Sequence, residues 1–245
     1  MGETKLVCFD LDGTLIKEIH SVMFLCILNG NLAPLREIEA LESSGSLDWI
    51  EADHRKALLL EGLRESKIRE EFHRILKPLK NIGHVVEILR SHGIRSVLIS
   101  AGPRQVARVA EEMWGFDSSE GSDYETLKGF FTGKILEHVG ETGKNAILRS
   151  YCEMHGIRRN ECVAVGDGVS DIALFDYCGE SIAINYSPVL SGKASRYLRT
   201  DDLNDILGLL GIGFDLAFGL KEIPLYGKTK FREAVRGIVL RQEMV

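Results

Sequence analysis

The sequence predicts an α/β protein built on a doubly wound parallel sheet, and two observations predict this fold class. First, short apolar runs recur along the chain without polar alternation, which is typical of strands that are buried on both faces. Second, segments with helical periodicity lie between these runs, so the strands should pair in parallel through right-handed crossover connections. The four apolar runs are residues 6–9, 96–99, 162–165 and 182–184.

The helical segments between the predicted strands are identified by apolar stripes. Apolar residues three and four positions apart fall on one face of a helix, and that face can pack on a sheet. Three such stripes are Ile82, Val85, Val86 and Leu89; Val106, Val109, Ala110 and Met113; and Ile147, Tyr151 and Met154. Alternation of these helices with the apolar runs supports the doubly wound fold.

The interval between the first and second predicted strands is too long for a crossover connection. Residues 16–77 show helical patterns and no strand pattern. We therefore expect an all-helical cap domain at residues 16–77, inserted over the end of the first strand into a core domain of residues 1–15 and 78–245. Residues 124–139 contain glycine-centred turns between apolar runs, which predicts a β-hairpin.

The composition argues against several functional classes. The chain has 245 residues, 44% of them hydrophobic and 27% charged, which is typical of a soluble globular protein. Its net charge of -6 argues against a nucleic-acid partner, and its longest apolar stretches are too short to span a membrane. Five scattered cysteines without a CxxC pair favour a reducing cytoplasm over a disulfide framework or a zinc site. The composition leaves the oligomeric state open.

The C-terminal segment differs from the rest of the chain in its charge. Residues 221–245 hold six basic and three acidic side chains. A solvated terminal helix accounts for this charge, and a docking surface for a partner is the alternative.

Acidic side chains follow two of the predicted strands at the points where these strands end. Asp10 and Asp12 come directly after the first strand, and Asp167 and Asp171 come after the third. The carboxyl ends of parallel strands meet at one edge of a sheet. We therefore expect the four carboxylates to lie in one crevice.

Such a group of carboxylates requires a cation. Two unit charges ~4 Å apart repel by about 4 kcal/mol at an effective dielectric constant of about 20. Oxygen ligands favour Mg²⁺ over zinc or copper, and a magnesium ion with few protein ligands keeps positions for water and a phosphate oxygen. The donors to that phosphate would be Ser100, Lys144 and the backbone amides near Ala101 and Gly102. The sequence therefore predicts a magnesium site that binds a small phosphorylated molecule.

Four motifs carry a resemblance to a known family. In chain order they are FDLDGTL (9–15), LISAG (98–102), TGKNAIL (142–148) and VGDGVSD (165–171). This series resembles the four signature motifs of the haloacid dehalogenase (HAD) superfamily of phosphatases, over roughly residues 5–200. The helical insertion after the first motif and the hairpin before the third resemble the phosphoserine phosphatase-like branch. The resemblance implies a Rossmann-like HAD core.

The resemblance also implies roles for the motif residues. Asp10 resembles the nucleophile that becomes an aspartyl phosphate, and Asp12 resembles the general acid and base. Magnesium would be bound by Asp10, by the backbone carbonyl of Asp12 and by Asp167. Asp171 is expected to hold the water shell of the metal or to orient Lys144. Together these roles describe a magnesium-dependent phosphomonoesterase.

The predicted cap differs from the family pattern at the positions that contact the substrate. Phosphoserine phosphatases have an acid for the substrate amine where this chain has Ile19, and Glu18 stands one residue earlier. The arginine for the substrate carboxylate falls by ungapped comparison on His54, and Arg55 follows it. Ser170 stands where the family usually has Asn. Phosphoserine is the leading substrate, with Glu18 and Arg55 as its contacts, although both side chains would equally fit a solvent-exposed cap surface.

Other functions stay open beside phosphoserine hydrolysis. Aspartyl-phosphate chemistry also fits a phosphatase for a different small phosphate ester, or a phosphotransferase whose acceptor is not water. A non-catalytic binding module on the same fold would have no need for carboxylates that repel one another. A receiver-type signalling domain would have no reason to carry a long inserted cap.

Overall fold

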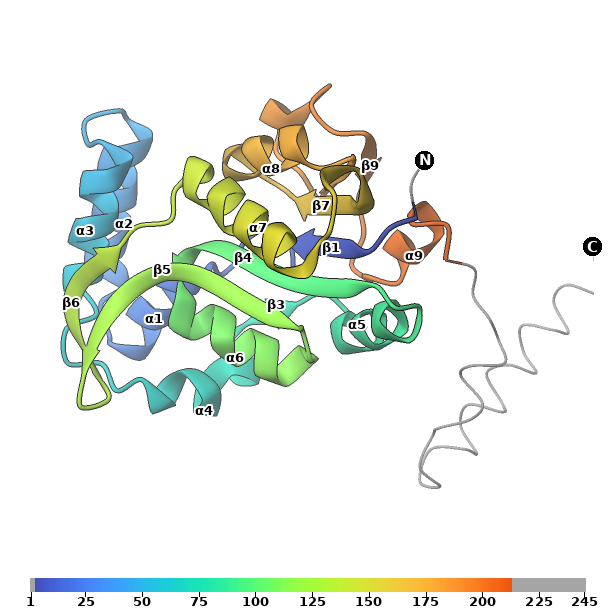
Figure 1. The fold of residues 1–245 in the computed structure, drawn as a ribbon. Coiled ribbons are helices and arrows are strands. Elements are labelled where there is room, and N and C mark those ends of the chain that lie inside the picture. The colour runs from blue at the N-terminus through green and yellow to red at the C-terminus, as the bar shows by residue number, and fades with distance from the viewer. Residues whose placement is uncertain (1–2, 213–245) are drawn as a thin grey trace, which may run out of the picture.

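The computed structural model describes residues 3–212 and contains a seven-stranded sheet with helices on both faces (Figure 1). The strand order is β6-β5-β4-β1-β7-β8-β9, and every neighbouring pair is parallel except β5 and β6. The predicted doubly wound α/β fold is confirmed. The strands are β1 (Leu6–Phe9), β4 (Arg95–Pro103), β5 (Ser118–Leu127), β6 (Phe130–Glu137), β7 (Cys162–Gly166), β8 (Glu180–Ile184) and β9 (Arg196–Leu198).

The central strand β1 is buried on both faces, as its unalternated sequence predicts. Val7 and Phe9 belong to one hydrophobic core, whereas Leu6 and Cys8 belong to a second. Helices α5 and α6 contribute to the first core, and α7 and α8 contribute to the second, on the opposite face of the sheet (Figure 1). The helices of this part are α5 (Ile82–Ser91), α6 (Arg104–Trp114), α7 (Glu141–His155), α8 (Ile172–Tyr177) and α9 (Asp205–Leu209), with 3-10 helices at Arg159–Glu161, Val169–Asp171 and Pro188–Leu190.

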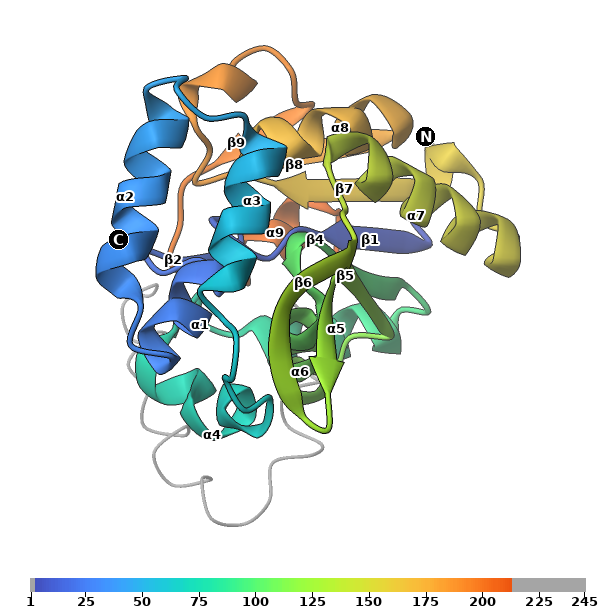
Figure 2. The same ribbon diagram turned by 90° about the vertical axis from the view of Figure 1, so that its left-hand side faces the viewer.

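The segment from β2 to β3, residues 16–78, forms a mainly helical insertion at the carboxyl edge of the sheet (Figures 1 and 2). Two short antiparallel strands stand at its base, and the helix expected from residue 16 begins only at Ser21 because residues 16 and 17 pair with 78 and 77. The division into two domains at residues 15 and 78 stays a prediction. The elements are β2 (Ile16–Lys17), α1 (Ser21–Leu28), α2 (Leu32–Ser43), α3 (Trp49–Leu58), α4 (Ser66–Ile75) and β3 (Lys77–Pro78).

The insertion is attached to the β5–β6 hairpin as well as to its base. The Gly62 amide donates to the carbonyl of Phe131 and the Phe131 amide donates to the carbonyl of Leu63, each across 2.9 Å. Helix α3 packs beside β6 (Figure 2), where Gly133 has a φ of +84° and a Cβ atom would lie 3.3 Å from the Cα of Leu58. The predicted hairpin is confirmed, although its first strand begins earlier, at Ser118, and also extends the main sheet.

The sequence also led to expectations about the cysteines, about membrane-spanning stretches and about the C-terminal segment. All five cysteines are free and buried. Within residues 3–212, no helix combines the length and the apolar character that crossing a membrane requires. The basic segment 221–245 lies outside the described residues.

Candidate active site

The loop that follows β1 is held close to the end of β7. The Asp10 amide donates to the carbonyl of Val165 across 2.9 Å, and the Asp10 side chain is buried. Gly13 has a φ of +85°, and a Cβ atom at this position would overlap the carboxylate of Asp167. Glycine at this turn therefore allows the two strand ends to approach each other.

Lys144 places a buried positive charge between these strand ends. It lies in the first turn of α7 and has no exposed surface. Its Nζ donates to Asp10 Oδ1 across 2.6 Å, to Asp171 Oδ1 across 2.9 Å and to Ser170 Oγ across 2.9 Å. Three acceptors match the three protons of an ammonium group, so Lys144 joins the end of β1 to the segment after β7.

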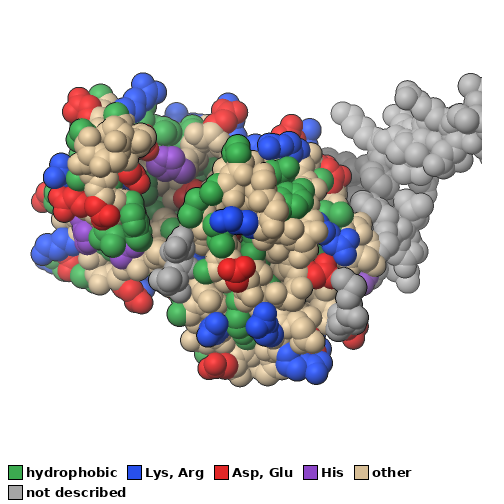
Figure 3. Space-filling model, turned by 90° about the horizontal axis from the view of Figure 1, so that it is seen from above, with side chains coloured by type: hydrophobic (Ala, Val, Ile, Leu, Met, Phe, Trp, Pro, Cys, Tyr) green, Lys and Arg blue, Asp and Glu red, His purple; other side chains and the backbone are tan. Residues whose placement is uncertain are grey.

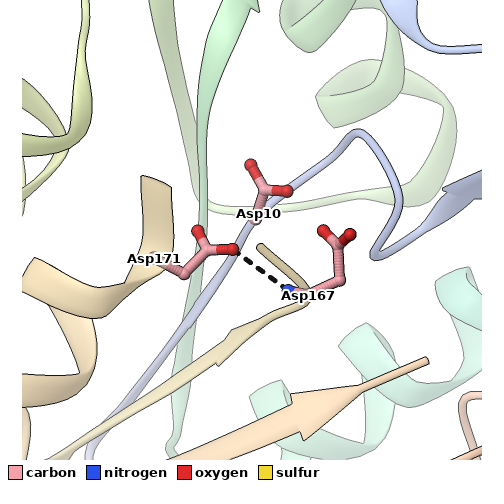
Figure 4. A group of neighbouring side chains, drawn as sticks. All are labelled: Asp10, Asp167 and Asp171. Atoms are coloured by element: carbon pink, nitrogen blue, oxygen red, sulfur yellow. Dashed lines mark hydrogen bonds between the residues drawn. The ribbon is translucent and has the colours of Figure 1, made fainter. Parts of the chain in front are cut away.

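Three of the four predicted carboxylates converge around this point (Figure 4). Asp10, Asp167 and Asp171 each offer one oxygen atom, and these atoms all lie within 4.8 Å of one another. Asp171 Oδ2 accepts hydrogen bonds from the backbone amides of Asp167 (3.0 Å) and Gly168 (3.1 Å), which fixes its orientation. The Thr14 hydroxyl lies within hydrogen-bond distance of both Asp10 (3.2 Å) and Asp167 (3.0 Å).

The environment shifts the pKa values of these groups. Burial, followed by the charge of Asp171, raises the pKa of Asp167 to about 6. Burial and the other two carboxylates raise the pKa of Asp10, while Lys144 opposes the shift. Burial alone would lower the pKa of Lys144, but Asp10 and Asp171 outweigh it and raise this pKa above its ordinary value. Lys144 is therefore an ammonium at any physiological pH.

The group fits a divalent cation. One ammonium faces three carboxylates, so two negative charges are left when all three are ionised. An ion of charge +2 would neutralise them, and it would oppose both the burial and the repulsion that raise the pKa values of Asp10 and Asp167. The available ligand atoms are all oxygens, which Mg²⁺ prefers.

The Asp12 side chain turns away from this group, towards the helical insertion. Its Oδ1 accepts from the Ser21 amide across 2.7 Å, and its Oδ2 accepts from the Ser21 hydroxyl. Ser21 is the first residue of α1 and is buried. The carboxylate of Asp12 therefore lies at the boundary between the sheet edge and the insertion, and only its backbone stays with the β1 loop.

The end of β4 lies on the other side of Asp12. Ser100 is buried, and its Oγ accepts from the Gly102 amide across 3.0 Å. A Cβ atom at Gly102 would overlap the hydroxyl of Ser21 and would lie 2.9 Å from Asp12 Oδ2 and 3.3 Å from Ser100 Oγ. Glycine at 102 therefore keeps open the space that these three side chains share. Ala101 contributes its carbonyl to a 2.6 Å hydrogen bond from Ser122.

Glu18 and Arg55 lie apart from the strand-end group. Glu18 follows β2 with a φ of 65°, is exposed, and forms an ion pair with Lys77 across 2.5 Å. Arg55 is half exposed, pairs with Glu51 across 3.0 Å, and lines a groove between α3 and β6. Among the described residues, neither side chain bonds to a strand-end carboxylate, and their assignment as substrate contacts stays a prediction.

Two site contacts escaped sequence reasoning. Thr14 belongs to the first motif, so its position beside Asp10 was visible, but its second contact with Asp167 joins residues 153 positions apart. Ser21 lies in an apolar helix, SVMFLCIL, and nothing in that stretch indicates a contact with Asp12. Only the fold brings these partners together.

The described site and fold define a family. The model of the haloacid dehalogenase-like hydrolases matches residues 7–176, which include all four motifs. The chain therefore belongs to this family.

Named relatives place the chain more closely. A phosphoserine phosphatase of Streptococcus thermophilus is 29% identical over 213 residues, which cover 86% of this chain and 98% of the relative. A phosphoserine phosphatase of Streptomyces coelicolor is also 29% identical, over 218 residues and 85% of this chain. That alignment covers 50% of the relative, and the alignment with phosphoserine phosphatase SerB2 of Mycobacterium tuberculosis covers 51%. The chain thus spans about half the length of these two relatives.

Solved structures agree with this placement. A phospho-aspartyl intermediate analogue of phosphoserine phosphatase superposes with a TM-score of 0.72 at 26% identity, covering 85% of this chain and 99% of that one. A substrate-bound phosphoserine phosphatase complex superposes with a TM-score of 0.73 at 25% identity, with the same coverage.

Proposed function

We propose that the protein is a magnesium-dependent phosphomonoesterase that acts on a small phosphate ester through an aspartyl phosphate, with phosphoserine as the leading substrate. One observation carries the proposal: the Asp10 carboxylate lies 2.6 Å from the buried Lys144 ammonium, in a group with Asp167 and Asp171. Family membership and the names of the relatives support the same chemistry. The proposal includes a cytoplasmic location, which the free cysteines favour. It includes no nucleic-acid partner and no membrane partner.

The first step transfers the phosphoryl group to Asp10. A carboxylate oxygen of Asp10 forms a bond to phosphorus while the ester bond from phosphorus to the alcohol oxygen breaks. Asp12, in its protonated form, gives its proton to the departing oxygen, so the product leaves as a neutral alcohol. The hydrogen bonds from Ser21 hold Asp12 towards the insertion, which is where the alcohol would depart in this mechanism.

The second step returns the enzyme to its starting state. Asp12, now a carboxylate, takes a proton from water as the water oxygen attacks phosphorus, and the bond between phosphorus and Asp10 breaks. Ser100 offers a donor to the phosphoryl oxygens, where negative charge develops, and Lys144 offers the proton that it no longer donates to Asp10 once that carboxylate is esterified. Both donors are buried, so little reorganisation is needed during the reaction.

Magnesium, when bound, neutralises charge on the phosphoryl oxygens and on the surrounding carboxylates. Asp10, Asp167 and the backbone carbonyl of Asp12 would hold it. Asp171 accepts from Lys144 and from two backbone amides, so its primary part is to orient the ammonium.

A substrate panel tests the proposal. Purified protein with Mg²⁺ should release phosphate from an aryl phosphate and from O-phosphoserine, and Asp10→Asn should abolish both activities. EDTA should do the same reversibly. Hydrolysis at the wild-type rate by Asp10→Asn would refute the nucleophile, and indifference to EDTA would refute the metal. Phosphate release that requires an added acceptor alcohol would replace hydrolysis by phosphoryl transfer.

A further inference from the structure

The connecting segment, residues 138–140, joins the β5–β6 hairpin to α7 and lies against the helical insertion. His138 Nε2 lies 2.9 Å from Asp53 Oδ2 on α3, and the two side chains are 16% and 24% exposed. The ring of Trp49, also on α3, meets the His138 ring edge to face, with the centroids 5.1 Å apart. A Cβ atom at Gly140 would lie 2.8 Å from the Trp49 ring, so glycine at this position lets the insertion pack closely on the segment.

The Asp53 carboxylate is a charged acceptor for His138. Its other oxygen, Oδ1, accepts from Lys56 Nζ across 3.0 Å, and Lys56 is 8% exposed. Burial would raise the pKa of Asp53, but the hydrogen bond with His138 and the ammonium of Lys56 outweigh burial and lower this pKa. Asp53 is therefore ionised at neutral pH and can only accept, so His138 carries a proton on Nε2 and donates it. A hydrogen bond to an ionised acceptor is stronger than one between neutral groups.

A chain of hydrogen bonds leads from the connecting segment to the end of β4. The Val139 amide donates to Ser122 Oγ across 2.9 Å, and this buried hydroxyl donates to the carbonyl of Ala101 across 2.6 Å. That carbonyl shares a planar peptide with the Gly102 amide, which donates to Ser100 Oγ across 3.0 Å. Ser100 Oγ thus accepts one hydrogen bond and keeps its own proton for a phosphoryl oxygen. The connecting segment therefore helps to fix the direction of that donor.

The connecting segment also begins α7. The carbonyl of Gly140 accepts from the Lys144 amide across 3.1 Å, which is the first hydrogen bond of this helix. The position of the segment therefore sets the position of the first turn, which carries the Lys144 ammonium. The bond between Asp53 and His138 joins α3 to the segment, and α3 and α7 belong to the two lobes on either side of a hollow with histidine and acidic side chains along it (Figure 3).

We propose that His138 is a positioning residue, which holds the connecting segment in place by donating to Asp53 of the insertion. The segment in turn orients two phosphoryl donors, the Ser100 hydroxyl and the Lys144 ammonium. The proposal rests on the proposed function, in which these two groups face the transferring phosphoryl group. His138 acts through the segment and not on the reacting atoms.

The proposal implies that the insertion supports the chemistry of the sheet edge as well as covering it. Donors that are fixed before the reaction stabilise the transition state more than donors that must first be ordered. Loss of the bond between His138 and Asp53 should therefore lower kcat more than it raises KM.

The test separates the hydrogen bond of His138 from its ring. His138→Phe keeps a ring beside Trp49 and removes the donor to Asp53. His138→Gln loses the ring, but its amide nitrogen can occupy the place of Nε2 and donate to Asp53. The control is His155→Phe, at an exposed position at the far end of α7. Steady-state kinetics with an aryl phosphate and Mg²⁺ measures kcat and KM, and thermal unfolding checks that each variant is folded.

We expect His138→Phe to lower kcat about tenfold, which is the low end of what the loss of one hydrogen bond to a charged group costs. His138→Gln should keep kcat within about threefold of the wild-type value and His155→Phe within about twofold, as positions that keep or never made the bond. A merely structural role would destabilise both His138 variants without this difference in kcat. Equal losses of kcat in the two His138 variants, or no loss in His138→Phe, overturn the proposal.

The failure of the proposed function would look different, because the wild type would then hydrolyse no ester. Amide hydrogen exchange, which reports local opening, decides on His138 in that case. Mass spectrometry should show faster exchange in His138→Phe for peptides that cover residues 99–104 and 139–147, and wild-type exchange there in His138→Gln and His155→Phe. Wild-type exchange of these peptides in His138→Phe would refute the role of His138 by itself.

Discussion

The carboxyl edge of the sheet and the helical insertion above it differ in how firmly their polar side chains are held. At the sheet edge, Lys144, Asp10 and Asp171 are buried and bonded to one another. On the insertion side, Glu18 and Arg55 are exposed and pair with exposed partners. The side chains at the sheet edge are preorganised for one reaction. The exposed side chains of the insertion can be replaced without disturbing the core. The sheet-edge side chains are thus fixed by one another, whereas the charged side chains of the insertion are held only by exposed ion pairs.

Lys144→Met should break the sheet-edge half of this comparison. The change removes the ammonium that bonds to Asp10 and Asp171 and a donor to the developing charge, so we expect kcat to fall by a factor of about 10³ or more. Steady-state phosphate release from an aryl phosphate measures the loss. Lys193→Met, at an exposed position, is the control, and a loss below about tenfold in Lys144→Met would contradict the assigned role.

The dependence of magnesium binding on pH should expose the repulsion at the sheet edge. The pKa of Asp167 is raised from its ordinary value of 3.8 to about 6, so the metal-free folded protein holds this proton more tightly than the unfolded chain does. The stability that this proton contributes is full below pH 4 and is lost as pH rises through about 6. Magnesium requires the ionised form, so its affinity should fall about tenfold per pH unit below pH 6.

Calorimetric titration with Mg²⁺ between pH 5 and 8 checks this dependence. Thermal unfolding adds an independent measure, because Mg²⁺ should raise Tm more at pH 7 than at pH 5. Asp167→Asn should weaken binding about 10- to 100-fold and flatten the profile. An affinity that does not change between pH 5 and 8 would show that Asp167 is not a ligand.

Ser21→Ala should sharpen the comparison at the point where the two regions meet. The Asp12 carboxylate keeps the amide hydrogen bond but loses the hydroxyl one. We expect kcat to fall about tenfold on an alkyl phosphate, whose leaving group needs a proton, and by less than about threefold on an aryl phosphate. Parallel kcat measurements on both esters check this, and equal losses would show that Ser21 does not act through Asp12.

Arg55→Ala should have the smallest effect on the fold. An exposed ion pair one helical turn apart contributes about 0.5 kcal/mol or less, so the midpoint of urea unfolding should barely move. If Arg55 binds the substrate carboxylate, KM should rise for O-phosphoserine and stay unchanged for O-phosphoethanolamine. Equal KM changes for the two esters would remove Arg55 from the substrate site.

The sequence predicted much of the sheet because the relevant signals are local. The unalternated run at Leu6–Phe9 indicated burial on both faces, and the observed strand is buried at each of its positions. The edge strand β9 and the two-residue strands β2 and β3 escaped prediction, because such short segments have no periodicity to read.

The candidate site shows the same division between local and distant signals. The motif residues at strand ends could be placed in one crevice from the sequence alone, because parallel strands bring their carboxyl ends together. The side chains that orient these motif residues could not be predicted from the sequence. Ser21 reaches Asp12 from an apolar helix, and that stretch carries no local pattern that indicates chemistry.

By itself, the sequence determined the α/β architecture, the order of the four motifs and the chemical type of the site, because strand burial and paired acids are written in neighbouring residues. Only the tertiary structure decided that Asp12 faces the insertion while Asp10, Asp167 and Asp171 surround Lys144. The physical reason is that side-chain direction and contact across more than a hundred residues follow from packing, which no local periodicity encodes.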